Sequence, residues 1–123
     1  MSSMNELKIS ETLKELGVPV NLSGYFYLKY AVEVMLEDMS LVHYITKKLY
    51  PMVATKFNTT PSKAERAIRH AKEVGWHKGD SELRRELFRN TIDKTQCQPT
   101  NSEFIATIAD WLNMTCGKEA DGK

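Results

Sequence analysis

The polar residues between positions 62 and 70 have the types and the spacing of side chains that read DNA. If the segment is helical, one face of it carries Ser62, Lys63, Glu65, Arg66, Arg69 and His70. The opposite face carries small or aliphatic residues at helical spacing, namely Ala64, Ala67, Ile68, Ala71 and Val74. Cations beside an acid suit hydrogen bonding to base edges in the major groove, and small inward residues let a helix lie close to its support. The pattern predicts a recognition helix.

The residues around this segment favour a helix from 61 to 76. Thr60 is a good N-cap, and Pro61 suits the first helical position because its missing N–H would be unpaired there anyway. Gly79 suits the end. A short helix is expected from Tyr50 to Phe57, and a turn of about three residues then leads to Pro61. Two helices joined in this way have helix-turn-helix geometry.

The net charge of +1 conceals an uneven distribution of charge. Residues 47–72 hold one acid, Glu65, and seven cations: Lys47, Lys48, Lys56, Lys63, Arg66, Arg69 and Lys72. This block therefore carries a net charge of +6, and the rest of the chain carries −5. A local cationic block on an otherwise ordinary surface is typical of a phosphate-binding face, with a solvated helix face as the alternative.

The remaining segments also have helical periodicity, which predicts an all-α single domain. Helices are expected from Asn5 to Leu16, from Ser23 to Asp38, from Ser81 to Phe88 and from Thr100 through Leu112, with Ser23 as the N-cap of the second. A further helix should begin with Ser40 as its N-cap, and Pro51 should divide or kink it. Thr100 and Glu103 form a capping box for the last of these. We place the folded domain at residues 1–116 and a polar tail at 117–123.

Other classes of protein find little support in the sequence. No apolar run approaches the ~20 residues needed to span a bilayer, and no signal peptide is evident, so a cytoplasmic protein without membrane attachment is expected. Cys97 and Cys116 lack the spacing of a zinc site or a disulfide framework. No nucleophile–base pair or phosphate-cradling loop is present. We therefore expect no enzyme activity, no cofactor and no metal.

Four runs of residues resemble one known family. They are Gly24-Tyr25-Phe26-Tyr27-Leu28, Ile45-Thr46-Lys47-Lys48-Leu49-Tyr50-Pro51, Glu65-Arg66-Ala67-Ile68-Arg69-His70-Ala71 and Pro99-Thr100-Asn101-Ser102-Glu103-Phe104-Ile105-Ala106. In order and nearly without gaps, they are similar to the C-terminal effector domain of stage-zero sporulation protein A, the response regulator of endospore formation. The resemblance extends from about Leu7 to Leu112.

The resemblance implies a six-helix, helix-turn-helix domain that binds double-stranded DNA and regulates transcription in sporulation. Members of the family read a promoter box with a TGTCGAA-like core, and two domains bind tandem boxes. The family's N-terminal receiver, which controls this pairing, has no counterpart in the 123 residues. That absence fits either an excised domain or a receiver-less relative.

Carried over residue by residue, the resemblance assigns base reading to Lys63, Glu65 and Arg66. Arg66 can donate two hydrogen bonds to guanine, and Glu65 can accept one from a cytosine amino group. Lys63 stands where the family leads us to expect arginine, so it lacks the planar fork.

Phosphate contacts are expected from two groups of residues. Ser62, Arg69 and His70 lie beside the base-reading positions, and Lys47 and Lys48 belong to the preceding helix.

The segment that contacts the RNA polymerase sigma subunit in the family maps to Ser81–Ile92. Leu87, Phe88 and Thr91 match the family pattern, whereas residues 84–86, 89 and 90 depart from it. An alternative function therefore stays open, that of a receiver-less protein-interaction module that modulates a sporulation regulator or sigma. DNA binding is better supported than activation.

Overall fold

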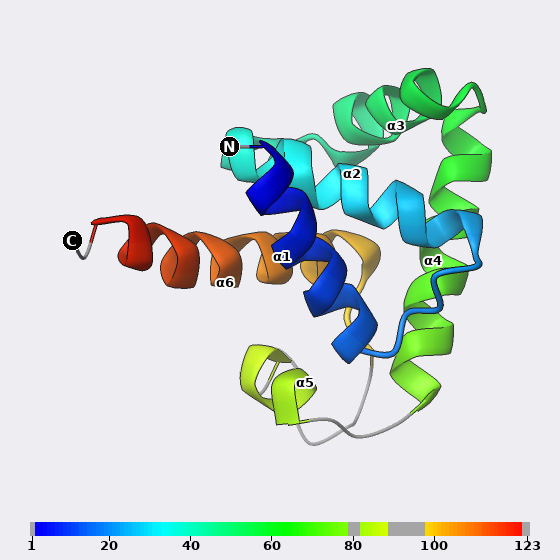
Figure 1. Ribbon diagram of the computed structural model, residues 1–123. Coiled ribbons are helices and arrows are strands. Elements are labelled where there is room, and N and C mark those ends of the chain that lie inside the picture. The colour runs from blue at the N-terminus through cyan, green and yellow to red at the C-terminus, as the bar shows by residue number, and fades with distance from the viewer. Residues whose placement is uncertain (1, 79–81, 89–97, 122–123) are drawn as a thin grey trace.

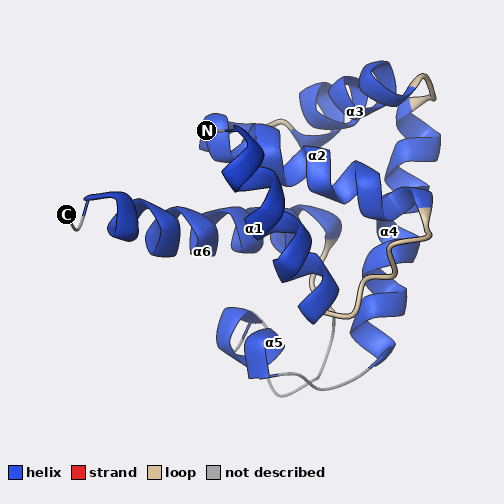
Figure 2. Cartoon of the chain, in the orientation of Figure 1, coloured by secondary structure: helices blue, strands red, loops and turns tan. Residues whose placement is uncertain are grey.

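A computed structural model describes residues 2–78, 82–88 and 98–121 and consists of helices and turns in these ranges. The described ranges contain six α-helices: α1 (Ser2–Glu15), α2 (Ser23–Glu37), α3 (Tyr50–Phe57), α4 (Pro61–Lys78), α5 (Glu82–Phe88) and α6 (Asn101–Asp121). The predicted all-α class is confirmed (Figures 1 and 2). No helix within the described ranges is long and apolar enough to cross a membrane.

Helix α2 lies at the centre of the molecule and packs against α1, α4 and α6 (Figure 1). Its inward residues Leu28, Val32 and Met35 are fully buried, together with Leu13 of α1 and Ile105 of α6. Full burial of one such side chain stabilises a fold by roughly 1.5–3 kcal/mol. These contacts provide the rigid support on which α4 lies.

The approach of α2 to α4 is unusually close because small residues meet there. A Cβ atom added to Gly24 would lie 2.7 Å from the Cβ of Ala71 and would also collide with the carbonyl group of Ala67. Near the C-terminal end of α4, a Cβ on Gly75 would lie 3.1 Å from a methyl carbon of Val18. These two close contacts, one in the middle of α4 and one near its end, determine the rotation of α4 about its axis.

The segment between α2 and α3 differs from the single helix expected there. Met39–His43 is a 3₁₀-helix, and Ile45–Leu49 is a π-helical turn. Its cap is Asp38 and not Ser40, because the Asp38 carboxylate accepts from the Ser40 backbone N–H at 3.1 Å and from its hydroxyl at 2.6 Å. Pro51 lies in the first turn of α3, as its lack of an N–H requires, so the predicted division is confirmed.

Three further boundaries differ from the sequence predictions. Ser23 is the first residue of α2 and not its cap; Leu22 occupies the cap position, without a side-chain hydrogen bond. Helix α1 extends from Ser2 to Glu15. Helix α6 continues to Asp121, into the residues assigned to the polar tail.

The start of α6 agrees with its prediction. The Thr100 backbone N–H donates to the Glu103 carboxylate at 2.9 Å, and the Glu103 N–H donates to the Thr100 hydroxyl at 3.1 Å. This reciprocal pair is the capping box that the spacing of these two residues predicts.

Candidate nucleic-acid interface

The turn between α3 and α4 is fixed by the backbone and by one side chain. Asn58 has a left-handed conformation, with φ of 57°, which asparagine adopts more readily than most residues, and its N–H donates to the Ala54 carbonyl oxygen. The Lys63 N–H donates to the Thr60 hydroxyl at 3.2 Å, so the predicted N-cap is confirmed. Helix α4 begins at Pro61 as predicted and ends at Lys78, two residues later than expected; Gly79 lies outside the described residues.

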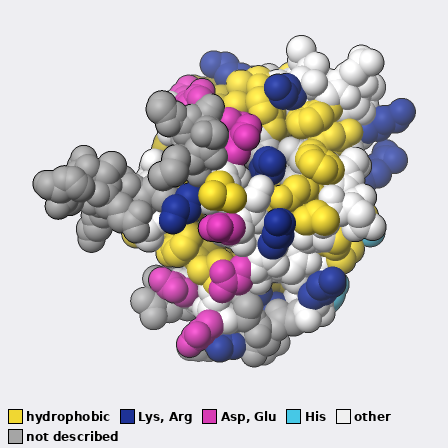
Figure 3. All heavy atoms as spheres, in the orientation of Figure 1, with side chains coloured by type: hydrophobic (Ala, Val, Ile, Leu, Met, Phe, Trp, Pro, Cys, Tyr) yellow, Lys and Arg dark blue, Asp and Glu magenta, His cyan; other side chains and the backbone are white. Residues whose placement is uncertain are grey.

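The two faces of α4 differ as the sequence predicts. Ala64, Ile68 and Ala71 are fully buried, and Ala67 and Val74 are partly buried. The polar face is exposed at Ser62, Lys63, Arg66, Arg69 and His70, and Lys47 and Lys48 before α3 are exposed as well. Lys and Arg side chains project at the right-hand edge of Figure 3, where Figure 1 places α4.

Glu65 is only partly exposed, and its carboxylate is paired within the helix. Arg69 donates to it twice, from Nε to Oε2 at 3.1 Å and from Nη2 to Oε1 at 3.3 Å. These hydrogen bonds, and then the charge of Glu65, raise the pKa of the Arg69 guanidinium. Separate roles were predicted for these two residues, although their spacing of four residues is the signal for such a pair.

A residue outside the helix-turn-helix also reaches Glu65. The side-chain amide of Asn101, at the start of α6, donates from Nδ2 to the Tyr50 hydroxyl at 3.0 Å. The same nitrogen lies 3.4 Å from the Glu65 backbone oxygen and 3.4 Å from Glu65 Oε2. Sequence reasoning missed Asn101, because the capping box at Thr100 and Glu103 already explained this stretch.

Lys72 does not belong to the cationic surface. Its side chain is buried, with an exposed fraction of 5%, and its ammonium group donates to the Pro99 carbonyl oxygen at 2.9 Å. Burial lowers the pKa of this ammonium, and the neighbouring Glu73 opposes the shift. Lys72 therefore connects α4 to the segment before α6. It is one of the seven cations in residues 47–72, and its ammonium group is unavailable to a binding partner.

The residues assigned to a sigma contact lie mostly in the core. Leu87 and Phe88 are buried, and the Phe88 ring stacks on Phe104 with centroids 5.6 Å apart. Thr91 lies outside the described residues. The side chains of Leu87 and Phe88 hold α5 against α6, so a partner that approached α5 would meet its exposed residues.

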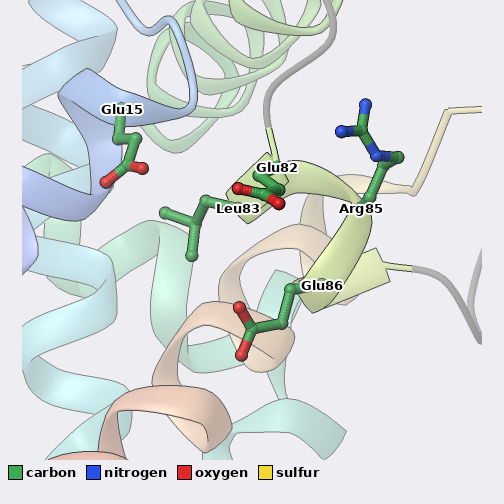
Figure 4. A pocket seen from close by; sticks show the side chains of 5 residues that line it. All are labelled: Glu15, Glu82, Leu83, Arg85 and Glu86. Atoms are coloured by element: carbon green, nitrogen blue, oxygen red, sulfur yellow. The ribbon is translucent and has the colours of Figure 1, made fainter.

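The exposed residues of α5 are two acids, Glu82 and Glu86, and one cation, Arg85. Glu15 of α1 and Glu82, Leu83, Arg85 and Glu86 of α5 line a hollow of about 780 Å³. Figure 4 shows Glu15 on one side of it and the α5 residues on the other, with the Arg85 side chain pointing away. This surface has the opposite charge to the exposed face of α4.

Most of the chain matches a known protein family. The family described as Sporulation initiation factor Spo0A C terminal matches residues 9–112. The matched span begins within α1 and ends within α6, so it includes the helix-turn-helix, Tyr50, Asn101 and the buried core that supports them.

Proposed function

The chain belongs to the Spo0A C-terminal family, and from this premise we propose that α4 reads DNA sequence in the major groove. The family is one of DNA-binding regulatory domains of sporulation initiation and is not an enzyme family. Action on the chromosome would place the protein in the cytoplasm.

The observation that carries this proposal is the division of α4 into two faces. Its small inner residues fit against Gly24 of α2, which leaves Lys63 and Arg66 exposed beyond the turn. Arginine and lysine are the side chains most often found on guanine edges. A helix supported from behind and cationic in front is the arrangement that a recognition helix needs.

The roles of the individual side chains follow from their chemistry. Arg66 donates to guanine O6 and N7, Lys63 donates to a second base, and Glu65 accepts from a cytosine amino group. A box with a TGTCGAA-like core contains the guanine and cytosine that these roles require. Ser62, His70, Lys47 and Lys48 contact phosphates on either side, and Arg69 does so with the donors that Glu65 leaves free.

Pairing of two domains is proposed to occur on tandem boxes. A contact with the sigma subunit through α5 is the weaker part of the proposal, because Leu87 and Phe88 are buried. Such a contact would involve the acidic residues around the hollow between α1 and α5 and a basic partner surface.

The test is a gel-shift titration at stated salt with a duplex that contains the family box and a scrambled duplex of the same composition. We expect binding to the box to be at least tenfold tighter, since specific sites typically exceed non-specific ones by 10³ or more. Equal affinity for both duplexes would refute sequence reading, and absence of binding to either would favour the protein-interaction alternative.

A further inference from the structure

The Glu65 carboxylate is held by donors from two different helices. Arg69, one turn further along α4, donates to both carboxylate oxygens at 3.1 and 3.3 Å. Asn101, at the first position of α6, also reaches Oε2 at 3.4 Å, through the amide hydrogen that it shares with the Glu65 backbone oxygen, since its other hydrogen goes to Tyr50. The proposed base-reading acid is thus oriented partly by a residue that lies 36 positions away in the sequence.

The number of acceptor positions shows what this arrangement leaves for DNA. A carboxylate offers about four lone-pair positions, two on each oxygen. Oε2 receives both Arg69 Nε and Asn101 Nδ2, and Oε1 receives Arg69 Nη2. One position on Oε1 remains, which is sufficient for one hydrogen bond from a cytosine amino group.

We infer that Asn101 is a positioning residue for sequence recognition, which orients the Glu65 carboxylate so that Oε1 is presented to the base. The inference rests on the proposed function, since it assumes that Glu65 reads a base. It assigns specificity to a residue of α6, outside the helix-turn-helix.

The environment of Asn101 supports a role beyond packing. Its exposed fraction is 8%, and its Oδ1 is one of two buried side-chain oxygen atoms without a hydrogen-bond partner in the described parts of the chain. A buried acceptor without a partner costs free energy that an apolar side chain would avoid. The hydrogen bonds that Nδ2 donates to Tyr50 and Glu65 therefore offset the free-energy cost of the unpaired Oδ1.

The orientation of this amide is also determined by its surroundings. Tyr50 could accept from Asn101 or donate to it, so its hydroxyl does not fix the orientation. The backbone oxygen and Oε2 of Glu65 can only accept hydrogen bonds, and a reversed amide would place Oδ1 against both of these atoms. Nδ2 must therefore face Glu65.

The experiment measures the affinity of the full chain for the family box and for duplexes with one base pair changed at each position. Glu65→Ala identifies the base pair that Glu65 reads. Asn101→Asp keeps the shape of the side chain but replaces the donor with a negatively charged oxygen that repels the Glu65 carboxylate. We expect it to reduce discrimination at that same base pair about three- to tenfold and elsewhere to leave it unchanged.

Two further variants separate positioning from stability. Thr100→Ala removes the capping box one residue away without touching Glu65, so its melting temperature should fall while its base preferences stay as in the wild type. The double variant Glu65→Ala with Asn101→Asp should discriminate no worse than Glu65→Ala alone, because Asn101 acts only through Glu65.

Each contrary outcome has a distinct meaning. If Asn101→Asp weakens binding to all duplexes by one factor, Asn101 has no part in base reading and the inference fails. If Glu65→Ala changes no base preference while the wild type still prefers the box, the inference fails and the proposed function stands. A wild type without any base preference refutes the proposed function and the inference with it.

Discussion

Arg66 and Arg69 lie one turn apart on the exposed face of α4, yet they differ in their availability. Arg69 is held by two hydrogen bonds to Glu65. Arg66 has no such partner among the residues that the structure describes, and its side chain is exposed. Its planar group of five donors is therefore free for bidentate contact with guanine.

Arg66→Ala should accordingly impair specific binding much more than non-specific binding. We expect a loss of about 1–3 kcal/mol of specific affinity, because one bidentate pair to guanine is removed. Titration of the box and of a scrambled duplex at one salt concentration measures both affinities. If the two fell by the same factor, Arg66 would be a phosphate contact.

The burial of Lys72 predicts a dependence of folding stability on pH. Its folded-state pKa is lowered from the ordinary value of 10.5, mainly by burial. Between the folded-state pKa and 10.5 the unfolded chain binds more protons than the folded one, so stability rises with pH in this range. The charged groups that act on Lys72 are Glu65, Arg69 and Glu73 of α4 and Glu103 of α6.

Lys72→Met removes this titration and keeps an unbranched, apolar side chain. The unfolding free energy of the wild type minus that of Lys72→Met should therefore increase with pH as pH rises toward 10.5, and then level off. Urea unfolding over a pH series measures the difference. Lys78→Met, at an exposed position on the same helix, serves as the control and should not reproduce the increase.

At the scale of the helices, the contact between α2 and α4 determines the rotation of α4 about its axis. Ala71 is fully buried, and the Cβ of Ala71 would lie 2.7 Å from a Cβ on Gly24. Ala71→Leu should lower the unfolding free energy by about 1–3 kcal/mol through overpacking. Gly24→Ala should destabilise as well, because it introduces the same collision from the other helix.

Thermal or urea unfolding checks both substitutions, with Thr55→Leu at an exposed position of α3 as the control for added volume. An Ala71→Leu protein as stable as the wild type would show that this face of α4 can accommodate a larger side chain. The rotation of α4 derived from the close contact would then be incorrect.

How much of the fold the sequence predicts depends on how local the cause is. Pro51, Thr60 and Pro61 act on their own backbone, so the limits of α3 and the start of α4 follow from the sequence alone. The 3₁₀ and π-helical turns before α3 do not follow, because the sequence indicated Ser40 as the cap of one regular helix, whereas Asp38 caps the 3₁₀-helix in the structure. The choice of cap depends on how the segment packs against the rest of the fold.

The residues of the candidate site can be separated in the same way, into those whose placement has a local cause and those whose placement depends on packing. The exposed positions of Lys63 and Arg66 follow from helical periodicity, because the spacing of side chains around α4 is a local property. The contact of Asn101 with Tyr50 and Glu65 spans 51 and 36 positions and depends on how α6 is placed against α3 and α4. The burial of Lys72 under Pro99 depends on the same placement, and no pattern in the sequence indicates it.

At the scale of the whole molecule, opposite charges occupy different surfaces. The exposed cations before α3 and on α4 form one surface, and Glu15, Glu82 and Glu86 line a hollow elsewhere. In Figure 3 the acidic side chains lie in the left and central parts of the view, where Lys and Arg side chains also occur, and the side chains that project at the right-hand edge are cationic. Such a separation orients the protein in the field of DNA before any base contact is made.

Binding should then depend steeply on salt. Three or four phosphate contacts per domain predict a slope of log affinity against log salt of about −2.7 to −3.6, at about 0.9 per phosphate. Lys47→Ala should make the slope shallower by about one unit and keep the base preferences, because Lys47 is exposed before α3 and is proposed to contact a phosphate.

Lys14→Ala makes the same change of charge near the far end of α4, since the turn after Lys14 contacts Gly75 and Lys78. Its slope should equal that of the wild type. Affinity measured across one salt series for the three proteins decides between the alternatives. A slope near zero in the wild type would exclude the groove-bound arrangement, because a helix that approaches base edges must displace counterions from the phosphates on both sides.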